Sequence, residues 1–202
     1  VDVLNQYYAL FEKVQHQKQQ EAEDQGRIFK PLTVATIFSF AANEELKVED
    51  SNGLIDEESA DIPTRISQSN RDKLDGYIAK YNAQFGQNFN SGDEFYAYYR
   101  DIANRVRKKE IDILLVVNMF LTGFDSKTLN TLYVDKNLKY HGLIQAFSRT
   151  NRILNADKPF GNIVCFRNLK QATDKALALF SNKAEAEKIV LIPSFESIKE
   201  KY

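Results

Sequence analysis

Residues 111–152 read IDILLVVNMFLTGFDSKTLNTLYVDKNLKYHGLIQAFSRTNR and decide the fold. The first part, 111–120, is a nearly continuous apolar run, which is typical of a strand covered on both faces in a parallel sheet. The next segment, 121–125, interrupts this run with a glycine between a hydroxyl and a carboxylate. A second strand is predicted at 131–134 and a helix at 141–152. Ligands of open α/β sheets bind at the carboxyl ends of strands, so a site is expected at the glycine-containing turn.

The predicted helix at 141–152 carries polar side chains at helical spacing. Gln145, Arg149 and Arg152 lie at i, i+4 and i+7, so all three are expected to project from one face. The apolar residues take the opposite side: Leu143, Ile144 and Phe147. An amphipathic helix with solvated arginines is one interpretation. The order of strand, TGFD turn, strand and Q-x-x-x-R-x-x-R favours another. A planar guanidinium can fork onto phosphate oxygens and offset the charge that develops in phosphoryl transfer.

These residues also carry a resemblance to known proteins. TGFD at 122–125 resembles motif V, and QAFSRTNR at 145–152 resembles motif VI, of the superfamily 2 helicases and translocases. The longer strings at 116–152 and 158–169 (KPFGNIVCFRNL) are similar, more narrowly, to the motor (R) subunit of type I restriction enzymes. The resemblance is dense over 30–169 and thin at both ends. Superfamily 2 proteins often carry glycine where this chain has serine before the first arginine, a departure that suits the restriction subunit.

The resemblance implies the second of two RecA-like lobes. Alternating strands and helices independently indicate an α/β fold with a mostly parallel sheet and helices on both faces. We expect an N-terminal helix and polar linker at 1–30, the lobe at 31–181 with an acidic insertion near 48–63, and a connector into a following helical domain at 182–202. No pair of the eight glycines has the G-x-x-x-x-G-K-S/T spacing of a Walker A loop. The chain alone is therefore expected not to hydrolyse ATP.

The same resemblance assigns roles at an ATP cleft shared with the first lobe. Arg149 and Arg152 would lie on the γ-phosphate side of ATP and Mg²⁺, with Gln145 orienting them. Gly123 would let the backbone approach the nucleotide. Asp125 would either face the ribose or hold the arginines. No protein metal site is expected in this chain.

A nucleic-acid face is implied as well. Thr122, Ser39 and Lys127 would touch the DNA backbone, although a serine at a strand end can equally be a turn former. Phosphate contacts position a protein without reading sequence, as a translocase requires. The implied partners are double-stranded DNA, the first RecA-like lobe of the same polypeptide, and methyltransferase and specificity subunits. The implied activity is DNA-dependent ATP hydrolysis and translocation in a restriction endonuclease.

Composition narrows the class of protein. With 43% hydrophobic residues, 27% charged residues and a formal charge of -1, the chain is neither a disordered tail nor a basic nucleic-acid binder. The single cysteine, Cys165, lies in an apolar run and is predicted to be a small core residue, while two distant histidines give no zinc cluster. No apolar run reaches membrane-spanning length, so a cytoplasmic location is expected. The only methionine is Met119, so we expect a piece of a longer protein.

The rest of the chain predicts further elements around this centre. An apolar stripe over 3–14 predicts a helix that fades into a polar run closed by Gly26. The other strands are expected at 32–40 and 161–167. The other helices are expected at 41–47, from 69 or 70 to 85, from a capping box at 91–94 to about 106, and at 171–180.

Two alternatives to the restriction motor stay open. One is a lobe of another superfamily 2 DNA or RNA helicase. The other is a non-catalytic α/β module that binds nucleic acid or a partner protein, in which the arginines form only a surface patch.

Overall fold

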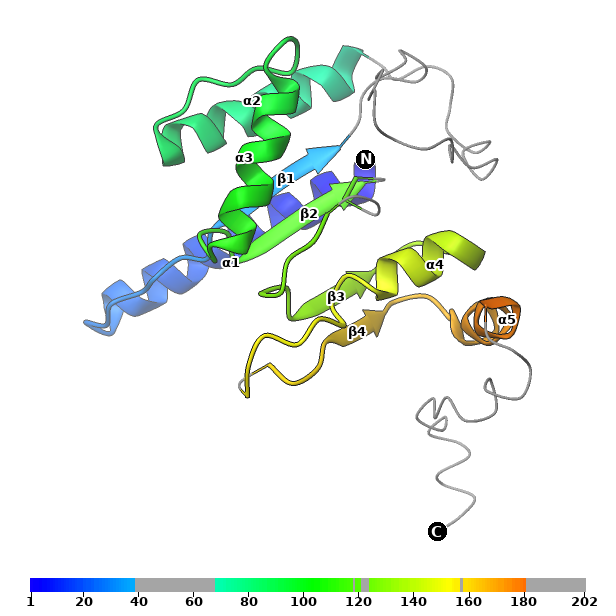
Figure 1. The fold of residues 1–202 in the computed structure, drawn as a ribbon. Helices are drawn as coiled ribbons and strands as arrows, with labels where there is room; N and C mark the ends of the chain where they lie inside the picture. Colours follow the sequence, from blue (N-terminus) through cyan, green and yellow to red (C-terminus); the bar gives the residue numbers. More distant parts are fainter. Residues whose placement is uncertain (39–67, 118, 121–123, 157, 181–202) are drawn as a thin grey trace. The chain divides into compact units, whose positions relative to one another are not determined.

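The chain forms two compact units that divide between residues 122 and 123 (Figure 1). The computed structural model describes residues 1–38, 68–117, 119–120, 124–156 and 158–180. The predicted helix at 41–47, the acidic segment at 48–63 and the connector at 182–202 lie outside these ranges. The domain boundaries expected from the sequence stay a prediction.

The first unit is built on one pair of parallel strands. Strand β1 (Val34–Phe38) lies beside β2 (Ile113–Val117), with Val34 opposite Ile113 and Phe38 opposite Val117. The helices of this unit are α1 (Asp2–Asp24), α2 (Gln68–Phe85) and α3 (Phe95–Arg107). Both strands were expected from their apolar runs, and their parallel pairing confirms the predicted α/β arrangement here.

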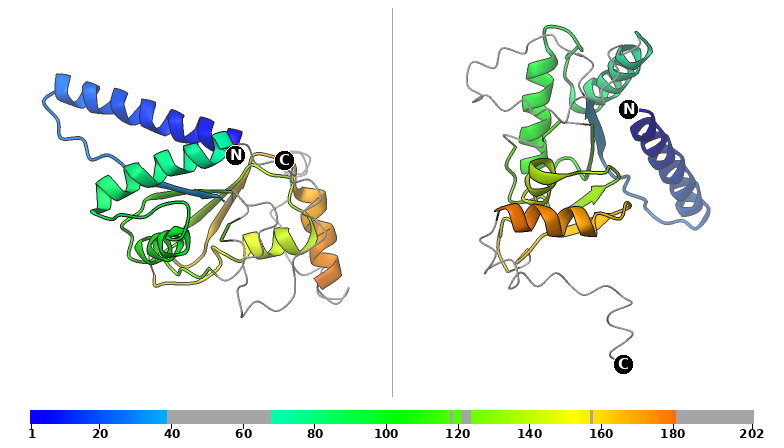
Figure 2. Two further views of the ribbon diagram at one scale, coloured as in Figure 1. Left: turned by 90° about the horizontal axis from the view of Figure 1, so that it is seen from above. Right: turned by 90° about the vertical axis from the view of Figure 1, so that its right-hand side faces the viewer.

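Helices cover both sides of this strand pair, with α1 and α3 on opposite sides (Figure 2). The ring of Tyr77 on α2 packs edge-on against Phe38 of β1, at 6.5 Å between centroids. Tyr98 of α3 is fully buried and donates its hydroxyl to the Thr36 carbonyl at 2.7 Å. The prediction of full cover on β2 is wrong at Val116, which is 38% exposed.

The ends of α1 and α3 show which local sequence signals determine where a helix begins or stops. Gly26 closes α1 with a φ of +62°, a left-handed conformation that suits glycine after a helix, as predicted. The predicted capping box at 91–94 is wrong, because Ser91 Oγ accepts from Arg71 and not from the helix. The oxygen of Asn90 instead accepts from the amides of Gly92 at 2.8 Å and Glu94 at 3.4 Å. The side-chain oxygen of Asn90, one residue earlier, therefore takes the capping role that was predicted for the Ser91 hydroxyl.

The second unit repeats the parallel arrangement with shorter elements. Strand β3 (Thr131–Val134) pairs with β4 (Asn162–Cys165), with Thr131 opposite Asn162 and Val134 opposite Cys165. Its helices are α4 (Tyr140–Phe147) and α5 (Lys170–Phe180), which pack against each other. Four buried residues form the centre of the core: Val134, Leu143, Leu169 and Ala176. Ile144 and Phe147 pack against the edge of this core, which confirms the packing role predicted for them.

Strand β4 and part of β3 are open to solvent. Tyr133 is 65% exposed and stacks on the exposed Phe166, with 6.2 Å between ring centroids. Cys165 lies on β4 as predicted, but it is exposed, so the prediction of a core cysteine is wrong. All four residues of β4 are exposed, which an apolar sequence pattern alone does not reveal.

Candidate functional site

The predicted arginine helix ends earlier than its sequence suggests. Helix α4 stops at Phe147, so Arg149 and Arg152 lie on the turn after it and not on one helical face with Gln145. Local side chains compete for the last carbonyls of the helix: Ser148 Oγ donates to the Gln145 carbonyl at 2.8 Å. Serine and threonine readily make such bonds, which favour helix ends over helix interiors. We name residues 148–152 the arginine turn.

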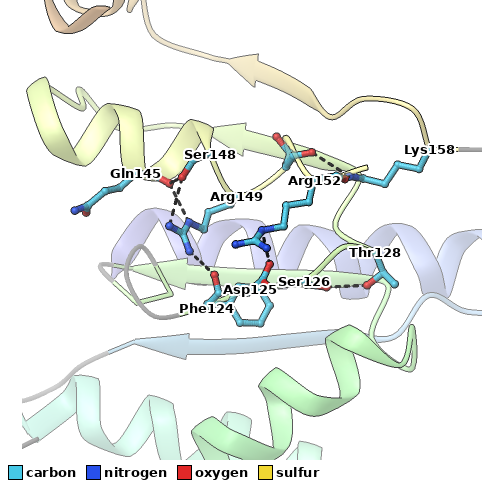
Figure 3. Close-up of polar contacts among 10 residues, drawn as sticks. Phe124, Asp125, Ser126, Thr128, Gln145, Ser148, Arg149, Arg152 and Lys158 are labelled. Atoms are coloured by element: carbon cyan, nitrogen blue, oxygen red, sulfur yellow. Dashed lines mark hydrogen bonds and ion pairs between the residues drawn. The ribbon is translucent and has the colours of Figure 1, made fainter. Parts of the chain in front are cut away.

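Main-chain oxygens fix Arg149 from two directions. Its Nε donates to the Gln145 carbonyl at 2.9 Å, and one Nη donates to the Phe124 carbonyl (Figure 3). The other Nη lies 3.4 Å from Ser148 Oγ. Among the residues that the structure describes, no carboxylate pairs with Arg149. Its charge is therefore held in place by neutral oxygens.

Arg152 has a charged partner. Its Nε lies 2.8 Å from Asp125 Oδ1, and the two side chains are 55% and 49% exposed. Asp125 stands between two buried residues, Phe124 and Ser126, and Ser126 is hydrogen-bonded to the Thr128 hydroxyl at 2.8 Å. This loop therefore presents the carboxylate outward from a fixed base. Asp125 thus contacts one of the two arginines, while its predicted roles at an ATP cleft stay predictions.

These groups border an open pocket of about 370 Å³ in the second unit. Its lining consists of Phe124, Asp125, Ser148, Arg149, Asn151 and Arg152. Two guanidinium groups therefore stand against one carboxylate. Since planar guanidinium forks match the oxygens of phosphates and carboxylates, this lining fits an anionic ligand better than a cation.

The other predicted site residues fall into two groups. The side chain of Gln145 points away from Arg149, and its main-chain carbonyl makes the contact instead (Figure 3). Lys127 is exposed and does not line the pocket. Ser39, Thr122 and Gly123 lie outside the described residues, so their roles stay predictions.

Three features of this site were not predicted from the sequence. The first is the carbonyl of Phe124, which is a main-chain group and cannot be recognised from the residue type. Asn151 lies inside the quoted motif and was passed over between the two arginines. Lys158 donates its Nζ to the carbonyls of Thr150 and Arg152, a contact that only the fold reveals.

In the described ranges, no three His, Cys, Asp or Glu side chains come together as metal ligands would. None of the helices that the structure describes is long and apolar enough to cross a membrane.

Comparison with known proteins gives the family. Residues 1–168 match the family described as type I restriction enzyme subunit R domain 3. The whole chain is 43% identical, over 206 aligned residues, to a type I restriction endonuclease subunit of Staphylococcus aureus, of which it covers 19%. A corresponding subunit of Staphylococcus saprophyticus is 45% identical over 194 residues, which are 95% of this chain and 18% of that protein.

A shorter match is found in another organism. A type I restriction endonuclease subunit of Methanocaldococcus jannaschii, itself named as putative, is 36% identical over 115 residues, which are 54% of this chain and 10% of that protein. The chain thus spans about a fifth or less of the length of these relatives. Since the family match covers most of its residues, the chain belongs to the type I restriction enzyme R subunits, within their domain 3.

Proposed function

We propose that this chain is part of the ATP-dependent motor of a type I restriction endonuclease, as its second RecA-like lobe. In that role it contributes the arginine side of an ATP cleft. The observation that supports this most directly is the arginine turn, where Arg149 and Arg152 border one pocket with Asp125. The parallel strand pairs and flanking helices are compatible with such a lobe.

Each arginine suits a distinct part of the task. Arg152 engages Asp125 through Nε, and its two Nη groups carry further N–H donors on a half-exposed side chain. Arg149 keeps its full positive charge beside neutral carbonyls. Both charges would stabilise the negative charge that develops on a transferring phosphoryl group. Asp125 would fix the direction of Arg152, so that little reorganisation is needed at the moment of reaction.

The nucleotide would be bound mainly by the first lobe of the same polypeptide. ATP with Mg²⁺ supplies the phosphoryl group whose hydrolysis drives the motor. No Walker A spacing occurs in the sequence, so the isolated chain is proposed to be inactive. Gly123 would allow the backbone close to the nucleotide.

Contacts with duplex DNA form the second half of the proposal. Thr122, Ser39 and Lys127 would touch phosphates and carry no sequence information. Methyltransferase and specificity subunits would complete a cytoplasmic complex, and sequence recognition would belong to them. The endonuclease activity named for the relatives would reside elsewhere in the full-length protein.

The decisive experiment uses the full-length protein in its complex with DNA. Arg149→Ala and Arg152→Ala should each lower ATP turnover by about 10³-fold or more, while binding of a fluorescent ATP analogue is largely retained. Exposed Lys175 on α5 offers a matched control, and Lys175→Ala should leave turnover near normal. Near-normal turnover in either arginine variant would contradict the proposal.

The same variants discriminate the alternatives. In a non-catalytic binding module they would change DNA affinity and its dependence on salt, with no ATPase activity in the parent protein to lose. A generic helicase would separate strands in an oligonucleotide assay, whereas a translocase of this class is expected to move on duplex DNA without separating its strands.

A further inference from the structure

A buried lysine reaches the arginine turn from the segment that follows it. Lys158 is only 5% exposed, and its Nζ donates to the Thr150 carbonyl at 3.0 Å and to the Arg152 carbonyl (Figure 3). A lysine carries three donors and no acceptor, and burying its charge is costly unless those donors are satisfied. Here the acceptors are main-chain oxygens of the arginine turn. The position of this lysine and the path of the turn are therefore coupled.

A glycine touches the same peptide from another direction. A Cβ added to Gly161 would lie 2.0 Å from the Thr150 carbonyl oxygen and 2.5 Å from its carbonyl carbon. Such distances are far inside van der Waals contact, and the neighbour is backbone, which cannot rotate away as a flexible side chain can. Any side chain at this position would have to push the arginine turn out of its present path. Glycine is thus required here by close approach.

The lysine is itself fixed by a local turn. The Lys158 amide donates to the Asn155 carbonyl and lies 3.2 Å from both oxygens of that residue, and the Leu154 amide donates to the Lys158 carbonyl at 3.3 Å. The Thr150 side chain is buried as well. Residues 154–156 and 158–161 therefore support one side of the arginine turn.

We propose that Lys158 and Gly161 are positioning residues that set the direction in which Arg152 enters the pocket. This inference rests on the proposed function of the arginine turn. Neither residue lines the pocket, so neither is expected to touch the nucleotide. Both act through the peptide groups of Thr150 and Arg152. A change at either residue should therefore lower turnover without a comparable loss of nucleotide binding.

The first test is a double-mutant cycle in the full-length complex. Lys158→Met keeps most of the side-chain volume and removes the donors, and it should lower ATP turnover by about 10-fold to 100-fold, because small misplacements of a catalytic group have effects of this size. The affinity for a fluorescent ATP analogue should change less than about threefold. In an Arg152→Ala background the same substitution should cause no further loss, because the two residues act as one unit. Lys175→Met, at an exposed position of α5, is the matched control.

The second test needs no nucleotide. The amides of Ser148 and Arg149 donate to Ile144 and Ala146, respectively, and their hydrogen exchange reports on the arginine turn. Lys158→Met should accelerate exchange there, by about tenfold, while the Thr173 amide of α5 keeps its protection. Gly161→Ala should give the same pattern with the lysine intact. Faster exchange in α5 with both variants would mean that these residues serve only folding, which would overturn the inference.

The outcomes separate this inference from the function on which it rests. If Arg152→Ala abolishes turnover while Lys158→Met and Gly161→Ala behave like Lys175→Met, only the positioning role is overturned. A loss from Lys158→Met that persists undiminished in the Arg152→Ala background would overturn it too. If Arg152→Ala itself leaves turnover near normal, the proposed function fails, and the positioning role with it.

Discussion

Arg105 of the first unit and the two arginines of the arginine turn in the second unit are bound in different ways. In the first unit, Arg105 is 18% exposed and is bound by two carboxylates, Asp101 at 2.7 Å and Glu110 at 2.6 Å. Its guanidinium also lies 4.1 Å from the centre of the Phe85 ring. In the second unit, Arg149 is held by neutral carbonyls and Arg152 by one half-exposed carboxylate. Charge that is neutralised inside the unit supports the fold, whereas charge that is left over is suited to a ligand.

The hydrophobic cores of the two units also differ. The first has a network of aromatic rings, with Tyr81 edge-on to Tyr98 at 5.0 Å and Tyr8 against Tyr77 at 4.5 Å. The second has a small aliphatic centre around Leu143. We therefore expect substitutions of the ring network to change stability, and substitutions around the arginine turn to change turnover.

The largest effect is expected at the centre of the ring network. Tyr98→Ala removes a fully buried ring and the donor to the Thr36 carbonyl. The local free energy of unfolding should fall by about 3–5 kcal/mol, as for other large core residues. Native-state hydrogen exchange of α3 amides measures this. A change below about 1 kcal/mol would show that the ring network does not hold the first unit together.

The next largest effect is expected from a substitution of Arg149 that changes the geometry of the side chain and keeps its positive charge. Arg149→Lys keeps the cation, but one ammonium cannot reproduce the fork between the Gln145 and Phe124 carbonyls. ATP turnover of the full-length complex should fall by about 10²-fold, the cost of misplacing a catalytic group. Exchange rates in α5 should not change. Full activity in the lysine variant would mean that only the charge of Arg149 matters.

A smaller, pH-dependent effect is expected in the first unit. Burial, and then the hydrogen bond to Asp101 at 2.7 Å, raise the pKa of Tyr81. The folded state thus favours the protonated phenol. The contribution of Tyr81 to the free energy of unfolding is fully present below the ordinary tyrosine pKa of about 10, and it is lost as the pH rises above that value.

Tyr81→Phe isolates this contribution. Near neutral pH the variant should lose about 1.5–2 kcal/mol of local stability, because the hydrogen bond is made to a charged group. As the pH rises from about 9 to about 11, the stability of the variant should fall less than that of the parent protein, because the variant has no phenol at this position to ionise. Pulse proteolysis in urea, followed at cleavage sites in α2, measures both. Identical losses above pH 10 in the two proteins would contradict the role of Tyr81.

Much of this architecture could be predicted from the sequence. Apolar runs located the four described strands, and the stripe over 3–14 with Gly26 located α1 and its end. The pattern failed where local hydrogen bonds compete with the helix, as at Ser148, and where Asn90 replaced Ser91. It failed again at Cys165, because an apolar run does not state which neighbours will cover it.

The candidate site was only partly predictable. The two arginines and Asp125 were identified from motif spacing, and the structure brings them together at one pocket. The support from Lys158 and Gly161 was missed, because it depends on a loop folding back onto Thr150. Periodicity describes one element at a time and carries no information on such a return.

One paired measurement tests the contrast between the units most directly. Arg152→Ala and Arg105→Ala are made in the full-length protein, and ATP turnover and local hydrogen exchange are recorded for both. We expect Arg152→Ala to lower turnover by about 10³-fold or more with exchange in α5 unchanged. Arg105→Ala should lower the local stability of α3 by about 1–2 kcal/mol and leave turnover near normal. The reverse pattern, near-normal turnover in Arg152→Ala and a collapse in Arg105→Ala, would contradict the account.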